Sequence, residues 1–185
     1  MKIQLTKTPI ADLLLIDINY SHDDRGFFIE PWHKKDFARA GLNLEFVQEG
    51  HSRSKKDVLR GLHYQDLSAP MGKLARCTYG SVFEVAVDLR MSSATFGRWF
   101  GVELSAKKKQ LLWVGVGLAL GFAVLSDFAE VQYKQTGYYT PASEGTLTWN
   151  DLDVGITWPV KKPILSFRDL HGQSLSQYKK NPAFG

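Results

Sequence analysis

Short apolar runs constrain the fold of this 185-residue chain more than any other feature. They are rich in Val, Ile, Leu and aromatic residues, and Gly, Pro, Asp and Ser clusters separate them at intervals typical of an all-β sandwich or barrel. The clearest alternation places Phe83, Val85, Val87 and Leu89 on one face of a strand. We expect strands at 13–18, 26–30, 58–64, 74–79, 81–89, 99–104, 110–114, 119–125, 130–136 and 145–149.

Turn and helix signals are few. Residues 79–81 read as a hairpin turn between two of these runs. A small helix is expected at 33–40, with Gly41 as its C-cap, and a second short one after Ser105. With no fixed-period repeat and no long linker, residues 1–185 should form one domain, an antiparallel double-sheet jelly roll with one or two short helices and a pocket at its mouth.

Charge and cysteine content narrow the function. The formal net charge is +4, but the positive residues are scattered and the longest dense run is 107–109. This pattern gives little support to a nucleic-acid partner and suits an anionic substrate such as a nucleoside diphosphate. Cys77 is the single cysteine, which excludes an intrachain disulfide, and the first residues do not resemble a signal peptide. We expect a cytoplasmic protein.

The apolar stretch 111–125 resembles a membrane segment at first sight. A bilayer-spanning helix needs about 20 residues, and glycines at 115, 117 and 121 would weaken a helix. We therefore expect a buried strand, a Gly-rich turn and a second buried strand, and no membrane partner.

Reactive side chains are densest at Arg60 to Gln65, followed by Lys73. An Arg, a His and a Lys on neighbouring strands could converge on one anionic ligand. On a regular strand, Arg60 and His63 would face opposite ways because side chains alternate, so Gly61 is expected to mark a bulge that re-aims one of them. The alternative is surface charge on an edge strand with a histidine satisfied in the core, and periodicity alone leaves both open.

Several segments resemble a known family. They are DDRGFFIE at 23–30, VLRGLHYQ at 58–65, VAVDLR at 85–90 and WND at 149–151, with further agreement at 95–97, 125–126, 131–134, 158–159 and 165–169. In this order they resemble the signature segments of the dTDP-4-dehydrorhamnose 3,5-epimerase family. The resemblance implies a cupin-type jelly roll, a homodimer, and epimerisation of a dTDP-linked 4-keto-6-deoxyhexose on the route to rhamnose, without a cofactor.

Catalytic roles follow from the resemblance residue by residue. His63 would be the general base, polarised by Asp169, and Tyr133 would supply a proton from the opposite face of the sugar ring. A carbon next to a ketone loses its proton only if the enolate oxygen is stabilised, which Lys73 would do. Free imidazole has a pKa of about 6.5, which suits a neutral base near pH 7.

Binding roles are implied in the same way. Arginine suits a diphosphate because its planar fork grips phosphate oxygens bidentately. The family's dimer typically shares the nucleotide site, so the Arg25 segment could act on its partner's site. The residues expected to bind substrate are Arg25, Phe28 and Glu30 toward the nucleotide, Gln48 and Arg60 toward the nucleotide and diphosphate, and Tyr139 near the diphosphate or sugar.

The chain departs from the family pattern at two positions near the expected pocket. Leu120 stands where a histidine is usual, and Gly50 stands where an asparagine is usual. Metal-dependent cupins need at least three protein ligands, and here only His63 remains in the corresponding segments. The other histidines, at 22, 33, 51 and 171, are expected in loop or helix contexts without ligand spacing, so we expect no metal site.

Two alternative functions remain open at this stage. The chain could be an enzyme of the same family that acts only at C3 or only at C5, or on a related dTDP-4-keto-deoxysugar, because such relatives keep the same base and acid. It could also be a degenerate cupin that binds a nucleotide sugar without turning it over, since fold does not settle function. A pure binder has no need of both an acid and a base.

Overall fold

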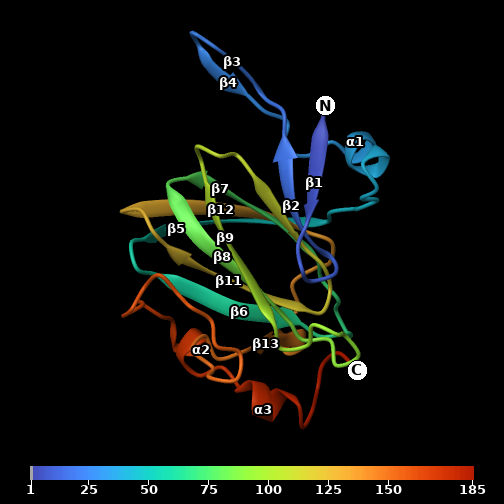
Figure 1. The fold of residues 1–185 in the computed structure, drawn as a ribbon, viewed down its shortest axis with the longest axis vertical. Helices are drawn as coiled ribbons and strands as arrows, with labels where there is room; N and C mark the ends of the chain where they lie inside the picture. Colours follow the sequence, from blue (N-terminus) through green and yellow to red (C-terminus); the bar gives the residue numbers. More distant parts are fainter. Residues whose placement is uncertain (1) are drawn as a thin grey trace.

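Two antiparallel sheets packed face to face make up most of the computed structural model, which describes residues 2–185 (Figure 1). The first sheet has the order β1 (Ile3–Lys7), β2 (Leu13–Ile18), β10 (Leu111–Val114), β7 (Lys73–Tyr79), β12 (Phe128–Gln135) and β5 (Gln48–Lys55). The second has the order β13 (Glu144–Thr146), β6 (Leu59–Gln65), β11 (Leu118–Val124), β8 (Ser81–Asp88) and β9 (Trp99–Ser105). Nearly every connection from β5 onward crosses between the sheets, which confirms the double-sheet jelly roll.

The strand expectations that rest on apolar alternation agree with the structure. The apolar stretch at 111–125 forms β10, a turn with Gly117 at φ 89°, and β11, as predicted. No helix within residues 2–185 is long and apolar enough to cross a membrane. Strand β5 was not predicted, because its sequence QEGHSRSK contains no apolar residue to reveal the alternation.

One of the two predicted short helices is present, and the other is replaced by a turn. Helix α1 (Lys34–Arg39) lies where a helix was predicted, and its side chain Phe37 is buried. The residues after Ser105 form a turn closed by the Lys109 N–H bond to the Ser105 carbonyl (3.0 Å), not a helix. Two helices of four residues, α2 (Phe167–Leu170) and α3 (Leu175–Tyr178), each begin after a serine whose side chain caps the first turn.

Strand β8 is buried on both faces. The predicted face, with Val85, Val87 and Leu89, packs against the C-terminal elements around Leu175 and Tyr178. The opposite face points between the two sheets, where Ala86 joins the main core. Both charged residues of this inner face, Glu84 and Asp88, are therefore buried.

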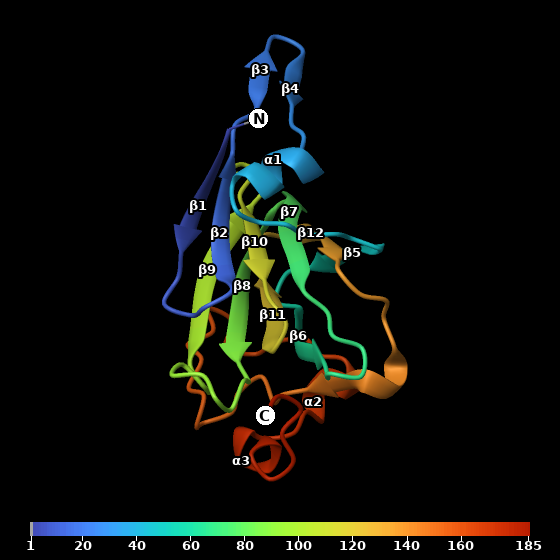
Figure 2. The ribbon, with the colours of Figure 1, turned by 90° about the vertical axis from the view of Figure 1, so that its right-hand side faces the viewer.

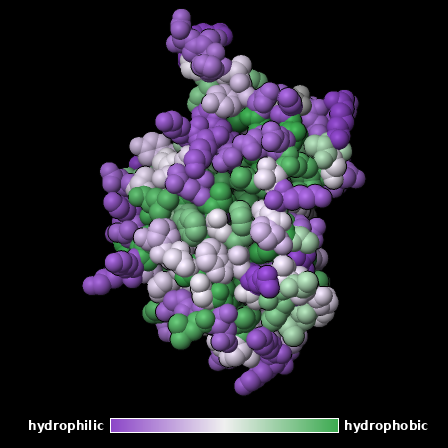
Figure 3. Space-filling model, viewed as in Figure 1, coloured by the Kyte–Doolittle hydropathy of each residue, from purple (hydrophilic) through white to green (hydrophobic). Residues whose placement is uncertain are grey.

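A hairpin of β3 (Ser21–Asp23) and β4 (Gly26–Phe28) projects from the body of the molecule, beyond the end of β1 and β2 (Figures 1 and 2). Its tip is hydrophilic on the face seen in Figure 3. Two aromatic rings of this hairpin remain in solvent, with Phe27 58% and Phe28 68% exposed. Lys109 joins this segment to the body of the molecule, with its Nζ 3.7 Å from the centroid of the Phe27 ring.

Candidate active site

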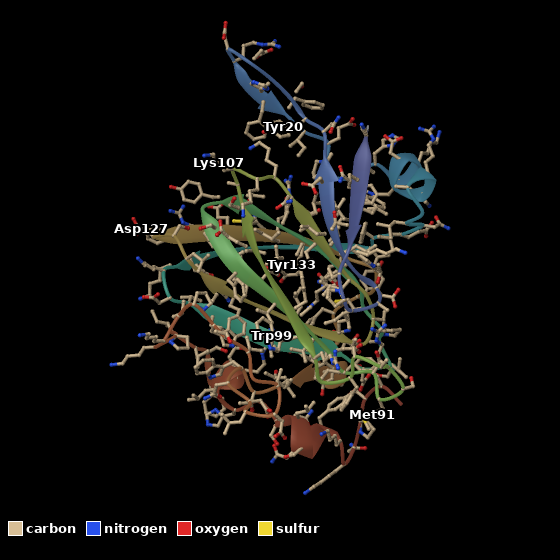
Figure 4. All side chains as sticks on the ribbon, in the orientation of Figure 1. Tyr20, Met91, Trp99, Lys107, Asp127 and Tyr133 are labelled. Carbon is tan, nitrogen blue, oxygen red and sulfur yellow. The ribbon has the colours of Figure 1, made fainter. Side chains whose placement is uncertain are left out.

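A cavity of about 570 Å³ lies between the two sheets. Strands β5, β6, β7, β8, β11 and β12 and helix α2 contribute its walls. Tyr133 on β12 is labelled in the middle of the barrel in Figure 4. A cavity of this size and position suits a small organic ligand.

A bulge in β6 brings Arg60 and His63 to the same cavity. His63 pairs with Leu120, but Arg60 pairs with Phe122, so β6 carries one residue more than β11 between these two pairs. Gly61 provides the extra residue at φ 127°, and a side chain there would meet the Gly121 Cα at 2.5 Å. The predicted bulge is confirmed, and the edge-strand alternative is wrong because β6 lies between β13 and β11.

His63 contacts a buried carboxylate. Its Nε2 lies 2.6 Å from the Oδ1 of Asp169, which is 2% exposed. The Ser166 hydroxyl donates to Asp169 Oδ2 (2.7 Å), and the Gly61 N–H donates to Oδ1 (3.3 Å). Burial acts to raise the pKa of Asp169, but the hydrogen bonds from His63 and Ser166 outweigh it and leave the pKa below its ordinary value. The carboxylate therefore accepts from Nε2–H, which leaves Nδ1 as the basic nitrogen.

Arg168 lies against the His63 ring, and sequence reasoning did not single it out. Its Nη2 is 3.0 Å from Nε2 and 3.3 Å from Nδ1 of His63. The same guanidinium pairs with Glu144, whose Oε2 also accepts from the Tyr139 hydroxyl (2.9 Å). The available signal was its position next to Asp169 in the sequence. Arg168 thus links α2 to β13 at one side of the cavity.

Lys73 and Glu84 are two ionisable residues of the cavity whose pKa values are both shifted by burial. Burial lowers the pKa of Lys73, and the nearby carboxyls of Glu144 and Glu84 only partly oppose that effect. Burial raises the pKa of Glu84 to about 8, against the opposing effect of Lys73. Both changes favour neutral forms, because desolvation disfavours charge. Glu84 was not predicted as a site residue.

Two polar atoms in the cavity wall lack a partner. Within residues 2–185, the Ser52 hydroxyl oxygen and the Glu84 Oε2 are buried side-chain atoms without a hydrogen bond. Both residues line the same cavity. Buried polar atoms are normally hydrogen-bonded, so this wall is suited to a ligand that brings its own polar groups.

Tyr133 and His63 come from facing sheets. Tyr133 belongs to the first sheet, with its ring centroid 5.9 Å from the Lys73 Nζ, and His63 belongs to the second. All three side chains line the cavity, as does Asp169. The structure therefore brings together the four residues named as catalytic candidates.

The predicted binding residues divide into two groups. Arg60 lines the cavity and its Nε donates to the Ser54 hydroxyl (3.0 Å). Gln48 accepts from the Tyr139 N–H (2.9 Å), next to the Glu144 and Arg168 pair. By contrast, the structure does not place Arg25, Phe28 or Glu30 at this cavity: all three are exposed on or just after the projecting hairpin, where the Arg25 guanidinium pairs with Asp23.

The remaining histidines lie in other surroundings. His22 is in β3 and His51 is in β5, not in the loops expected from the sequence. His51 Nε2 lies 3.2 Å from Glu130, and His171 Nδ1 lies 2.7 Å from the Phe167 carbonyl oxygen. In the part of the chain that the structure describes, no three His, Cys, Asp or Glu side chains are grouped as a metal site requires.

Comparisons with known proteins agree with this geometry. The family model described as dTDP-4-dehydrorhamnose 3,5-epimerase matches residues 7–177. The chain is 49% identical to the dTDP-4-dehydrorhamnose 3,5-epimerase of Shigella flexneri, over 92% of this chain and 95% of that protein. It is 37% identical to a dTDP-4-dehydrorhamnose 3-epimerase of Streptomyces niveus, over 80% of this chain and 72% of that protein. A solved dTDP-6-deoxy-D-glucose-3,5-epimerase from Legionella pneumophila, in complex with dTDP-4-keto-L-rhamnose, has a TM-score of 0.91 and 41% identity over 95% of this chain and 94% of its own.

Proposed function

The chain belongs to the dTDP-4-dehydrorhamnose 3,5-epimerase family, and on that premise we propose that it inverts both C3 and C5 of dTDP-4-keto-6-deoxyglucose to give dTDP-4-dehydrorhamnose. As a member of this family, the chain is an epimerase. One observation carries the assignment of its residues: a His63–Asp169 pair faces Tyr133 across a cavity that also contains Lys73. This arrangement provides a base and an acid on opposite walls.

The first step is proton removal by His63. The Nδ1 lone pair takes the proton from the carbon beside the ketone, and the electron pair of the C–H bond moves into the enolate, with charge on the ketone oxygen. The imidazolium that forms lies 2.6 Å from the Asp169 carboxylate. That contact stabilises the charged ring, and it leaves Nδ1 as the nitrogen that takes the proton.

Lys73 stabilises the enolate. Its amine lies among protein groups in the cavity and has N–H donors for the enolate oxygen in either protonation state, and such a hydrogen bond is stronger there than in water. A donor at the developing oxyanion needs no reorganisation when it is already in place, and Lys73 is the first residue of strand β7 in the first sheet.

Tyr133 returns a proton to the other face. The phenol O–H bond breaks, a C–H bond forms with the enolate electron pair, and the ketone is restored with inverted configuration. The phenolate then takes a proton from solvent, and the His63 imidazolium releases its proton to solvent, so both groups return to their starting forms. The same two residues serve both carbons if the sugar turns in the cavity between steps.

The diphosphate is expected at Arg60, with Gln48 and Tyr139 at the cavity edge. We also propose a homodimer, because Arg25, Phe28 and Glu30 lie too far out on their own chain to line its cavity, and the exposed hairpin can reach a second copy. Each hairpin would then complete the nucleotide site of its partner.

Residues 1–185 are proposed to act as one epimerase domain in the cytoplasm. Cys77, the single cysteine of the sequence, is a free, buried thiol, which suits a reducing compartment.

NMR in deuterated water tests the proposal. The protein is incubated with dTDP-4-keto-6-deoxyglucose, and deuterium is followed at C3 and C5 separately. We expect label at both carbons and inverted product. His63→Ala should lower both exchange rates by about 10² to 10⁴-fold, with dTDP binding measured by calorimetry unchanged, and His33→Ala at the start of α1 serves as the matched control.

The remaining outcomes separate the alternatives. Label at one carbon only would establish a mono-epimerase, the alternative that Leu120 beside His63 raises. Binding of dTDP without any label would indicate a degenerate binder or another keto-sugar. Unchanged exchange in His63→Ala would remove His63 from the mechanism.

A further inference from the structure

Few groups join the hairpin of β3 and β4 to the rest of its chain. Within residues 2–185, no hydrogen bond or ion pair connects residues 21–28 to another segment, and the Arg25–Asp23 pair lies inside the hairpin. A two-stranded hairpin is only marginally stable by itself in water. The direction of this hairpin relative to the two sheets therefore depends on the side chains that pack against it.

Lys109 contacts the hairpin through its charged group. Its Nζ lies 3.7 Å from the centroid of the Phe27 ring and 5.3 Å from that of Tyr20, and the centroids of these two rings lie 6.2 Å apart in an edge-to-face arrangement. Aromatic rings attract an ammonium group that lies within about 6 Å of their centroid. Figure 4 labels Tyr20 at the foot of the hairpin and Lys107 in the turn that also carries Lys109.

The turn between β9 and β10 fixes the place of this ammonium group. Lys109 has a φ of 55°, in the left-handed region that residues other than glycine rarely adopt. Its backbone N–H donates to the Ser105 carbonyl (3.0 Å), and its Nζ donates to the Ala106 carbonyl (2.8 Å). Lys109 is half-buried, whereas Lys107 and Lys108 of the same positive run are exposed. The position of the charge is thus set by the body of the molecule and not by the hairpin.

The two phenylalanines of β4 face opposite ways, because consecutive side chains alternate along a strand. Phe27 lies against Lys109 and lines a small pocket with Thr78 and Ala106. Phe28 therefore points away from Lys109, and it is 68% exposed. The contact that holds one face of the hairpin presents the other face, which carries Phe28, to a second molecule.

We propose that Lys109 is a positioning residue for nucleotide binding: by holding Phe27 and Tyr20, it sets the direction in which the hairpin presents its nucleotide-binding residues to a second copy of the chain. The inference rests on the proposed function and its homodimer, and it deepens both by naming the group that places the hairpin. Lys109 does not line the catalytic cavity. It therefore acts on substrate affinity through the hairpin, and not on proton transfer.

Substrate affinity and turnover separate in the test. Lys109→Met keeps the length of the side chain and removes the charge. KM for dTDP-4-keto-6-deoxyglucose, and Kd for dTDP measured by calorimetry, should both rise about 5-fold, the scale of one cation–π contact, while kcat stays unchanged. Lys109→Arg keeps a cation at the ring and should retain the wild-type KM. Lys107→Met removes an exposed charge from the same turn and serves as the matched control.

A second variant locates the effect at the hairpin. Phe27→Leu keeps an apolar side chain but removes the ring, so it should raise KM as Lys109→Met does, and the double variant should be no worse than either single one. It also provides a second folded variant if Lys109→Met unfolds. A lower melting temperature with unchanged KM in Lys109→Met, or additive losses in the double variant, would overturn the inference, because Lys109 would then serve only its own turn.

Phe28→Ala separates this inference from the proposed function. If the hairpin completes the nucleotide site of a partner, KM should rise in Phe28→Ala. An unchanged KM in that variant would contradict the proposed shared site itself. A raised KM in Phe28→Ala together with a wild-type KM in folded Lys109→Met would contradict only the role of Lys109.

Discussion

Two buried carboxyl groups on strand β8 have pKa values shifted in opposite directions. Glu84 and Asp88 lie four positions apart on the same face of β8, and are 1% and 0% exposed. Asp88 accepts hydrogen bonds from Arg90, Ser93 and Thr95, which outweigh the effect of burial and lower its pKa to about 2. Glu84 has an Oε2 atom without a partner among residues 2–185, and burial raises its pKa to about 8. Partners, not burial, decide which carboxyl keeps its charge.

The difference separates a structural region from a functional one. The Asp88 cluster closes the end of β8 and satisfies every acceptor it presents, as a stability-determining network should. Glu84 faces the cavity beside Lys73, where unsatisfied groups lower stability and remain available to a ligand. Active sites commonly retain such groups at a cost in stability.

The largest expected effect comes from breaking the satisfied cluster. Asp88→Asn keeps the shape but removes the charge that faces Arg90, so the free energy of unfolding should fall by about 3 kcal/mol. Urea unfolding at pH 7 measures it, with the exposed Asp153→Asn as the control. A loss below about 0.5 kcal/mol, the range of ordinary surface substitutions, would contradict a stabilising role.

Low pH should remove the same contribution of Asp88 to the free energy of unfolding. The folded-state pKa of Asp88 is about 2, below the ordinary value of 3.8, so its stabilisation is complete above about pH 4 and is lost as the pH falls toward 2. The difference between the ordinary and the folded-state pKa of Asp88 corresponds to about 2.4 kcal/mol. Unfolding followed by circular dichroism from pH 5 to 2 should show a steeper decline in the wild type than in Asp88→Asn.

Glu84 should give the opposite sign at higher pH. Its folded-state pKa of about 8 exceeds the ordinary 4.5, so the folded state holds the proton more tightly and loses stability as the pH rises between those values. Glu84→Gln is neutral throughout, so it should be more stable than the wild type at pH 8.5, by a margin that shrinks to almost nothing at pH 4.5. A pH-independent difference in melting temperature would show that Glu84 has a partner in solution.

The smallest expected effect comes from giving Glu84 a hydrogen-bond partner, as Asp88 already has. Leu120 pairs with Ala86, and Phe122 pairs with Glu84, so a histidine at 120 lies diagonal to Glu84 on the same face. Leu120→His should therefore supply a hydrogen bond worth about 1 kcal/mol and raise turnover, with Leu120→Met as the apolar control. Neutral or lower turnover would show that the cavity has repacked around leucine.

The sequence predicted those parts of the fold that depend on apolar alternation. Strand β8 carries it clearly, β10 and β11 are continuous apolar runs, and β2 is nearly one; all four form the interior of the two sheets. Strand β5 is polar on both faces because its inner face lines a cavity and not a core, so the usual signal was missing. The edge strand β1 and the two four-residue C-terminal helices are too short to show a period.

The candidate site was predictable where residue identity carries the chemistry. His63, Lys73, Tyr133 and Asp169 were named from family resemblance, and the structure gathers them at one cavity. Their roles remain predictions. The importance of Glu84 could not be anticipated, because a glutamate in an alternating strand looks like a solvent-facing residue until the second sheet is placed over it. Arg168 likewise depends on the fold of α2 against β6.

The extra residue at Gly61 has a consequence for how such sites can be recognised. In an unbroken strand, only residues separated by an even number share a face. Arg60 and His63 are separated by three, and they share a cavity because the count is shifted once between them. The glycine therefore changes which residues of the strand share a face: beyond it, residues at odd separations from Arg60 lie on the same face as Arg60. A motif search that required even spacing along strands would discard this pair, so catalytic patterns in β proteins are better sought with one allowed change of parity at a glycine.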